Sequence, residues 1–189
     1  MTRVHVIRHG CPASTWGGAD EDPGLDEAGR QQAIKVMEVL MALPEGERPR
    51  RVVSSPLRRC RETAEPMAQA LGVALTIDPR VGEIPTPAGM PAAERPAWLR
   101  SAFGGEWSQI VGDQDYEAWA LGVAAAVAEH PNAAVFSHFV ALNAAVGVAT
   151  GEASVAAFRP DHCSITTFDI RDGRLILKEK GREAQSQVL

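Results

Sequence analysis

Short β-branched apolar runs alternate with longer segments of helical periodicity along most of this chain, and no other feature of the sequence limits its fold as strongly. Strands are predicted at residues 4–7, 52–53, 73–77 and 133–136. Helices are predicted at about 27–43, from Pro56 to the residue before Gly72, at 116–129 and at 139–149. Strands that alternate with helices favour an α/β domain, here a three-layer doubly wound one, with a mostly parallel sheet and helices on both faces.

Two segments depart from this alternation. Residues from about 83 to 118 contain several prolines and three of the tryptophan and phenylalanine side chains, so we expect an irregular lid that carries substrate recognition. Near the end of the sequence, Asp172-Gly173 separates apolar runs at 164–170 and 175–178. Because Asp-Gly suits a type I′ turn, a C-terminal β-hairpin is predicted there.

Composition restricts the classes of function. A chain of 189 residues with 45% hydrophobic residues is expected to form one domain, spanning 1–189. Its net charge of -5 argues against a nucleic-acid-binding face, and no apolar run reaches the ~20 residues of a membrane span. Three cysteines without a secretory signal pattern favour free thiols and a cytoplasmic location. The oligomeric state is not specified by these features.

Polar residues gather where the apolar runs end. Arg8 and His9 follow the first run, Arg59 lies one turn into the helix after the second, and His138 follows the run at 133–136. Ligands of parallel α/β sheets bind at the carboxyl ends of strands, and neighbouring strands lie ~4.8 Å apart. Two arginines and two histidines brought together repel one another unless an anion lies between them. A phosphoryl group fits, because arginine presents a fork that matches its oxygens.

These segments closely resemble the motifs of the histidine phosphatase superfamily, the phosphoglycerate-mutase-like proteins. The matching segments are Arg8-His9-Gly10 (the RHG signature), residues 55–64 (S-P-L-x-R-A…T-A, with the second arginine at Arg59), Ser137-His138, and residues 25–33 (L-T-x-x-G-x-x-Q-A). RHG alone is weakly specific, whereas four segments in the family order and at strand ends are strongly so. The resemblance runs over nearly the whole chain.

The resemblance implies a metal-independent phosphatase without a cofactor, acting on a small phosphorylated substrate. His9 is then the nucleophile that becomes phosphohistidine, and Arg8, Arg59 and His138 hold the phosphoryl oxygens. Glu83 matches the position of the family's general acid. Gly10 and Phe139, which flank the two histidines, are the further candidates for substrate binding.

Three departures from the family pattern bear on these assignments. Residues 11–14 (CPAS) replace the Thr and Asn that often follow RHG, and Phe139-Val140 replaces a common pair of glycines. Both changes affect the lining of the pocket. The Pro-rich segment 84–91 stands where a G-x-x-E-G sequence is common, which bears on Glu83 as the acid.

Other polar residues are interpreted as structural. Arg58 is expected at the surface, and Ser54 and Ser55 are expected to cap the second helix rather than act as nucleophiles. The remaining histidines, His5, His130 and His162, are assigned structural positions. Trp98, Trp107 and Trp119 are assigned to core or lid packing.

Competing phosphatase chemistries fit the sequence poorly. A cysteine-dependent phosphatase needs Arg six residues after Cys, but Gly17, Pro66 and Asp169 occupy these positions. An aspartyl phosphatase needs D-x-D-x-T after a hydrophobic strand, and Asp113-Gln114-Asp115 lacks both the strand and the Thr. Within the family, a phosphoglycerate mutase is the alternative, although members with that activity tend to be longer. A non-catalytic phosphate-binding module also stays open.

Overall fold

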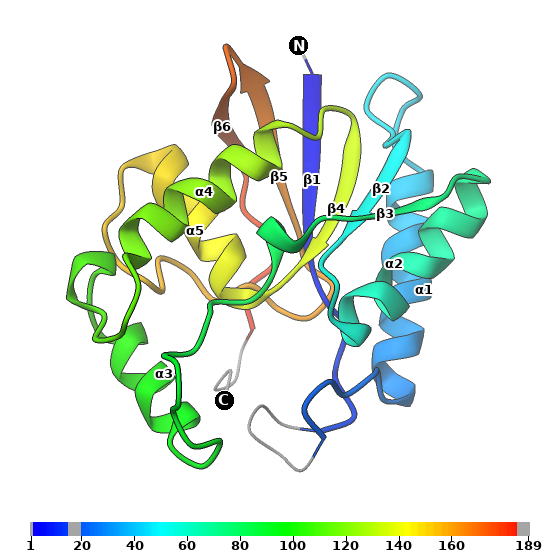
Figure 1. Cartoon of the computed structure of the whole chain (residues 1–189). Helices are drawn as coiled ribbons and strands as arrows, with labels where there is room; N and C mark the ends of the chain where they lie inside the picture. Colours follow the sequence, from blue (N-terminus) through cyan, green and yellow to red (C-terminus); the bar gives the residue numbers. More distant parts are fainter. Residues whose placement is uncertain (1, 15–19, 185–189) are drawn as a thin grey trace.

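One six-stranded mixed sheet organises the protein, which we describe from a computed structural model over residues 2–14 and 20–184 (Figure 1). The strand order is β3-β2-β4-β1-β5-β6. The strands are β1 (Thr2–Arg8), β2 (Arg51–Ser54), β3 (Leu75–Ile77), β4 (Ala133–Ser137), β5 (Ile165–Arg171) and β6 (Arg174–Glu179). β3, β2, β4 and β1 run parallel, and β5 and β6 are antiparallel to their neighbours. The predicted mostly parallel sheet is therefore confirmed.

Helices cover both faces of the sheet. They are α1 (Glu27–Met41), α2 (Arg58–Leu71), α3 (Arg95–Phe103), α4 (Tyr116–Ala128), α5 (Phe139–Thr150) and the short 3₁₀ helices η1 (Pro79–Val81) and η2 (Trp107–Gln109). α1 and α2 lie on one face, and α4 and α5 lie on the other (Figure 1). This arrangement confirms the three-layer architecture. Among the described helices, none combines the length and the apolar character needed to cross a bilayer.

Two hydrophobic clusters hold the layers together because β1 and β4 are buried on both faces. Ile7 and Phe136 point toward α1 and α2, where they pack with Leu40 and Met67. Val6 and Val135 precede Ile7 and Phe136, respectively, by one residue. They therefore face the opposite way, into the cluster of α4 and α5. Continuous apolar runs of this kind are typical of central parallel strands. They fix the polar residues that follow them at one edge of the sheet.

Helix termini account for small differences from the predicted boundaries. The predicted strand at 73–77 begins only at Leu75. The reason is that Val73 donates its N–H to Ala68 O (3.1 Å) and so completes the C-terminal cap of α2. Gly72 adopts the left-handed conformation that such a cap requires, with φ of 65°. The predicted hairpin is confirmed, and both Asp172 and Gly173 have the positive φ of a type I′ turn.

The segment predicted as an irregular lid is more regular than expected. It contains α3 and η2, and the expectation of wholly irregular structure was wrong for these residues. Its Leu99 and Trp107 pack with Tyr116 of α4 and Phe139 of α5 in a third hydrophobic cluster. The prolines do not oppose this helix, because Pro96 lies in the first turn of α3, where its missing N–H needs no partner, and the other prolines of the segment precede the helix. Closure of this segment over a ligand stays a prediction.

Candidate active site

The carboxyl ends of β1 and β4 lie side by side and fix the first two site residues. Arg8, the last residue of β1, pairs with Ser137, the last residue of β4. His9 then donates its backbone N–H to Ser137 O (2.9 Å). His138 follows immediately, so the two histidine rings come from adjacent strand ends, with centroids 5.3 Å apart. The predicted convergence of these strand ends is present.

Gly10 allows the chain to turn away from β1 in very little space. A Cβ at this position would lie 2.7 Å from Gly29 O, so any side chain would collide with the backbone of α1. The N–H of Gly10 donates to Thr63 Oγ1 of α2 (3.0 Å), and Thr63 Oγ1 in turn donates to Arg59 O (2.6 Å). Gly10 therefore ties β1 to both helices on this face. Its contact with a substrate stays a prediction.

Arg59 links the two histidines. Its Nε donates to His9 Nε2 (3.2 Å), and its second terminal nitrogen lies 3.2 Å from His138 Nδ1. The side chain is 5% exposed, whereas that of its neighbour Arg58 is 57% exposed and pairs with Glu62 on the helix surface. The predicted division between the two arginines is confirmed. It follows from helical periodicity, since consecutive residues on a helix point in directions about 100° apart.

Hydrogen bonds select which nitrogen of His9 is available. His9 Nδ1 lies 2.8 Å from Gly10 O, and a carbonyl only accepts, so Nδ1 carries the hydrogen. Nε2 then keeps its lone pair, directed toward Arg59. Burial holds the pKa of His9 well below its usual value, and the neighbouring His138 and the positive charge of Arg59 act in the same direction. A neutral imidazole with a free Nε2 lone pair is a competent nucleophile at pH 7.

His138 is held as a second neutral imidazole. Its Nε2 lies 2.7 Å from Ser55 Oγ, which also accepts the N–H of Leu57 (3.3 Å) at the start of α2. Burial, aided by Arg59, holds the pKa of His138 well below its usual value. The Sγ of Cys60 lies 3.3 Å from the same Nε2, and burial raises the pKa of this thiol. The predicted capping of α2 by Ser54 and Ser55 was wrong, because the helix begins after Leu57 without a side-chain cap. Ser54 Oγ donates to Ser55 O (2.8 Å), and Ser55 orients His138 instead.

Arg8 has unused donor capacity. One terminal nitrogen donates to Pro160 O (2.9 Å), and the guanidinium lies over the Phe139 ring, 5.3 Å from its centroid. Among the described residues, the buried Nε of Arg8 has no hydrogen-bond partner. Burial lowers the pKa of Arg8 to about 10, so the group stays charged at neutral pH. A buried charged donor without a partner is costly unless a ligand satisfies it.

Phe139 serves mainly as a support for Arg8. The residue is 5% exposed, and its ring packs against Phe103 of α3, with centroids 5.0 Å apart. A packed series of side chains thus joins the predicted lid segment to Arg8. Direct contact between Phe139 and a substrate stays a prediction.

Glu83 reaches the cluster from the turn after η1. One carboxylate oxygen accepts the N–H of Ile84 (3.0 Å), and the other lies 3.8 Å from His138 Nδ1. The side chain is 14% exposed. Burial raises the pKa of Glu83 above its usual value, although the charge of Arg59 opposes this. The position of Glu83 beside His138 and its raised pKa are compatible with the general-acid role that the family resemblance implies. That role stays a prediction.

His162 is the residue that sequence reasoning misplaced. Its ring centroid lies 5.7 Å from that of His9, so this histidine borders the site. The reason is topological: β5 pairs antiparallel with β1, and the Ile7–Ile165 pair brings the loop before β5 to the carboxyl end of β1. The Asp172-Gly173 turn predicts that β5 pairs with β6, but it does not predict that β5 also pairs with β1. The structural positions predicted for His5 and His130 are confirmed, by Thr167 and Asp78 respectively.

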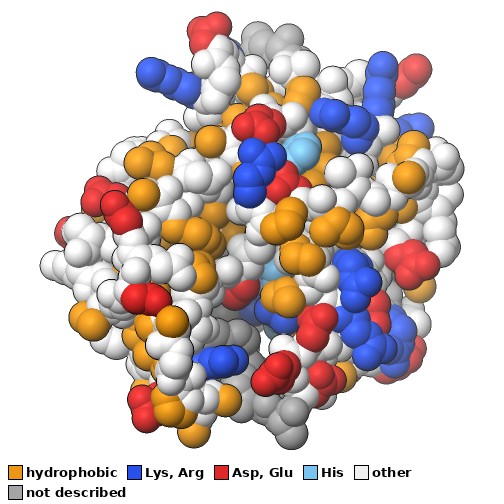
Figure 2. All heavy atoms as spheres, in the orientation of Figure 1, with side chains coloured by type: hydrophobic (Ala, Val, Ile, Leu, Met, Phe, Trp, Pro, Cys, Tyr) orange, Lys and Arg blue, Asp and Glu red, His pale blue; other side chains and the backbone are white. Residues whose placement is uncertain are grey.

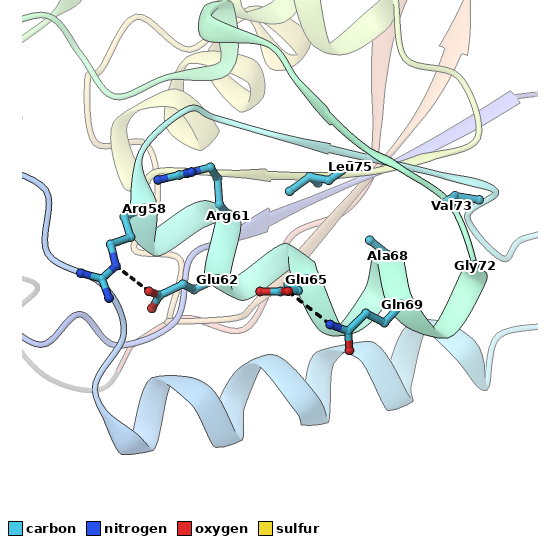
Figure 3. Close-up of a pocket in the computed structure, with 9 residues that line it drawn as sticks. All are labelled: Arg58, Arg61, Glu62, Glu65, Ala68, Gln69, Gly72, Val73 and Leu75. Atoms are coloured by element: carbon cyan, nitrogen blue, oxygen red, sulfur yellow. Dashed lines mark hydrogen bonds and ion pairs between the residues drawn. The ribbon is translucent and has the colours of Figure 1, made fainter.

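The shape of the molecule agrees with a site at this edge of the sheet. The face seen in Figure 2 is hollowed below its centre, and Lys or Arg and His side chains are visible at the hollow. A separate pocket of about 540 Å³ lies on the outer face of α2 (Figure 3). There the polar side chains bond to neighbours along the helix, Arg58 to Glu62 and Gln69 to Glu65, and do not converge on one point. Among the described residues, no group of His, Cys, Asp and Glu side chains is arranged to hold a metal ion.

Fold and site together define a class: an α/β domain in which buried imidazoles and arginine side chains meet at the carboxyl ends of adjacent parallel strands. The chain belongs to the histidine phosphatase superfamily (branch 1), whose family model matches residues 4–182. This membership confirms the resemblance that the sequence motifs indicate.

Similar proteins include both mutases and phosphatases by name. The probable phosphoglycerate mutase GpmB of Salmonella paratyphi A is 28% identical over 199 residues, covering 92% of this chain and 87% of the relative. Matches to the proteins of that name from Erwinia tasmaniensis and Citrobacter koseri extend over 94 residues, and the chain there spans 39% of the relative's length.

Solved structures with the same fold carry phosphatase names. A mycobacterial glucosyl-3-phosphoglycerate phosphatase has a TM-score of 0.73 at 22% identity, covering 97% of this chain and 100% of that chain. A phosphoserine phosphatase from Entamoeba histolytica, in complex with 3-phosphoglyceric acid, has a TM-score of 0.73 at 21% identity and covers 98% of each chain. At this level of identity the likeness establishes the fold.

Proposed function

We propose that the protein is a metal-independent phosphomonoester hydrolase that acts through a phosphohistidine on His9. One observation carries the proposal: Arg8 and Arg59, two buried guanidinium groups, border a neutral imidazole whose Nε2 is unprotonated and accepts a hydrogen bond from Arg59. Membership of the histidine phosphatase superfamily and the phosphatases among its structural neighbours support it. The substrate in this proposal is a small phosphorylated metabolite.

In the first step, His9 Nε2 attacks phosphorus in line and the ester oxygen leaves. Nδ1–H of His9 stays bonded to Gly10 O, so the positive charge that forms on the ring is stabilised. Arg59, which contacts His9 Nε2 without a ligand, is then free to donate to the phosphoryl oxygens together with Arg8 and His138. Charge-assisted hydrogen bonds of this kind contribute roughly 1.5–3 kcal/mol each.

Glu83 supplies the proton in this mechanism. Its raised pKa keeps a fraction of the carboxyl group protonated where an ordinary carboxyl group is ionised. Glu83 donates this proton to the leaving oxygen and then accepts one from the water that hydrolyses phosphohistidine. The uncatalysed reaction is among the slowest known and requires up to about 29 kcal/mol of barrier lowering. No single contact supplies that amount, so the groups act together.

The proposal is tested with p-nitrophenyl phosphate. We expect turnover by the wild-type protein, no loss with EDTA, and a loss on the order of 10⁴-fold or more in His9→Ala. Wild-type activity that EDTA abolishes would contradict metal independence, and full activity of His9→Ala would contradict the nucleophile. If the wild-type protein binds inorganic phosphate but does not turn over the substrate, a non-catalytic phosphate-binding module would be favoured.

A phosphoglycerate mutase is the second candidate, because relatives of this chain carry that name. Such an enzyme returns the phosphoryl group to a bound intermediate instead of to water. Incubation with 3-phosphoglycerate separates the two: we expect release of inorganic phosphate without isomerisation. Formation of 2-phosphoglycerate faster than release of phosphate would assign the mutase reaction.

A further inference from the structure

His162 borders the site on the side of Arg8, and the proposed mechanism leaves it without a role. It comes from the loop between α5 and β5, and its ring is tilted by 46° to that of His9. His9 and His138 are buried, whereas His162 is half-buried. His162 therefore lies between the buried histidines and solvent, which is the position of a group that can meet an entering ligand.

The loop that carries His162 is fixed from several directions. The carboxylate of Asp161 forms an ion pair with Arg182 (2.8 Å), and the backbone N–H of Asp161 donates to Arg182 O (2.9 Å). Cys163 donates its N–H to Arg8 O (3.0 Å) and has a φ of 53°, in the left-handed region. Such a conformation costs a non-glycine residue on the order of 1–3 kcal/mol and persists only where its surroundings enforce it. The contacts around Cys163 therefore outweigh this conformational cost and hold His162 beside the site.

His162 differs from the arginines in the kind of group that it recognises. Burial and the charge of Arg8 lower the pKa of His162 to about 4, although Asp161 and Asp26 oppose the shift. At neutral pH the ring is uncharged, with one donor nitrogen and one acceptor nitrogen. A hydroxyl group, which both donates and accepts, is its natural partner. A second anionic group would be better matched by a cation.

We propose that His162 binds the leaving group and selects phosphomonoesters whose alcohol carries a further hydroxyl close to the ester oxygen, as polyol and sugar phosphates do. This inference rests on the proposed function of the site. Phosphorus must come within about 3–3.5 Å of His9 Nε2 for attack, so the phosphoryl group fills the space beside Arg8 and Arg59. The alcohol then extends toward solvent, past the half-buried ring of His162.

Two substrates that differ only in hydroxyl groups test the inference. The kcat/KM ratio of sn-glycerol 3-phosphate to propyl phosphate is measured for the wild type, His162→Phe and His162→Gln. We expect the ratio to fall about 2- to 12-fold in His162→Phe, which keeps a ring but loses one hydrogen bond, and to recover partly in His162→Gln. His130→Phe is the matched control, and its ratio should equal that of the wild type.

An equal fall for both substrates would overturn the inference, since it would place His162 on the phosphoryl group or in a structural role. Wild-type kcat/KM values for both substrates in His162→Phe would overturn it as well. To separate this outcome from failure of the proposed function, the affinities of 3,4-dihydroxybutylphosphonate and butylphosphonate are compared by calorimetry. These compounds need no turnover: the wild type should prefer the dihydroxy compound, and equal affinities would reject His162 as a hydroxyl-binding residue even in an inactive protein.

Discussion

In the described part of the chain, two of the clusters that combine arginine, histidine and carboxylate side chains differ in how their charges balance. In the first, the active-site cluster, Arg8 and Arg59 surround His9 and His138, and Glu83 is the carboxylate within reach, 3.8 Å from His138. In the second, the η1–α4 ion cluster, Asp78 lies 2.8 Å from both Arg80 and His130, and Arg80 also pairs with Glu129 at 2.8 Å.

The difference appears in the pKa values of the two carboxyl groups. Burial raises the pKa of Glu83 and would do the same to Asp78. At Asp78, hydrogen bonds from Arg80 and His130 outweigh burial and hold its pKa below the usual value. A histidine beside an arginine therefore does not by itself mark an anion site. What marks it is a positive charge that the protein's own carboxylates do not neutralise.

Apart from the loss of His9 itself, the largest expected effect concerns Glu83, the proposed acid of the active-site cluster. Glu83→Gln should lower kcat for alkyl phosphates by about 10²–10⁴-fold, with a smaller loss on p-nitrophenyl phosphate, whose leaving group needs little protonation. Because the pKa of Glu83 is raised, its protonated form persists above the ordinary range and is lost as pH rises through the folded pKa. Wild-type activity on alkyl phosphates should fall on that basic side. A variant that keeps the same basic limb would reject Glu83 as the acid.

Substitution of one arginine in each cluster compares how much each cluster contributes to activity. Arg59→Ala removes donors from both histidines and from the phosphoryl group, so kcat/KM should fall by about 10²–10³-fold. Arg80→Ala removes an equally well bonded arginine from the η1–α4 ion cluster and should leave kcat/KM within about threefold. Equal losses in the two variants, measured on folded protein with p-nitrophenyl phosphate, would mean that Arg59 acts only through the fold.

Asp78→Asn should affect stability and spare activity. Leaving Arg80 and His130 without their buried carboxylate should cost about 2–4 kcal/mol of unfolding free energy at pH 7, measured by urea denaturation. The pKa of Asp78 is lowered by folding, so its contribution is complete above the unfolded pKa of about 4 and declines as pH falls toward the folded value. The gap between variant and wild type should therefore narrow below about pH 4. A gap independent of pH would show that the carboxylate charge is not the cause.

The smallest effect is expected at Arg58, the neighbour of Arg59. Its ion pair with Glu62 lies on the exposed face of α2, where screening by solvent leaves such a pair with little effect on stability. Arg58→Ala should change neither the melting temperature nor kcat/KM beyond a small margin. A loss of activity comparable to that of Arg59→Ala would mean that the assignment of the second site arginine is misplaced by one position.

Much of this site could be predicted because its residues directly follow strong strand signals. Arg8 and His9 follow a continuous apolar run, His138 follows another, and helical periodicity separates Arg59 from Arg58. The ends of parallel neighbours meet wherever the strands pair, so residue type and position sufficed. The contact of Glu83 with His138 was not predictable, because motif position alone does not place a side chain in space.

The parts that escaped prediction depend on pairings between distant segments. His162 borders the site only because β5 pairs antiparallel with β1, and Asp78 meets His130 across 52 residues of sequence. The helix α3 was missed because prolines argue against helix, yet its apolar side chains pack against α4 and α5. These contacts cannot be predicted from local sequence, because they form only when distant segments pack together.

Detection of a phosphoryl group on His9 during turnover tests the central claim most directly. The wild-type protein, quenched under alkaline conditions within the first turnovers of a ³²P-labelled substrate, should carry an acid-labile label on the peptide that contains His9. Glu83→Gln should still form this species when the leaving group is p-nitrophenolate. A label confined to another residue, or rapid phosphate release with no covalent species in a quench that preserves phosphohistidine, would contradict the account.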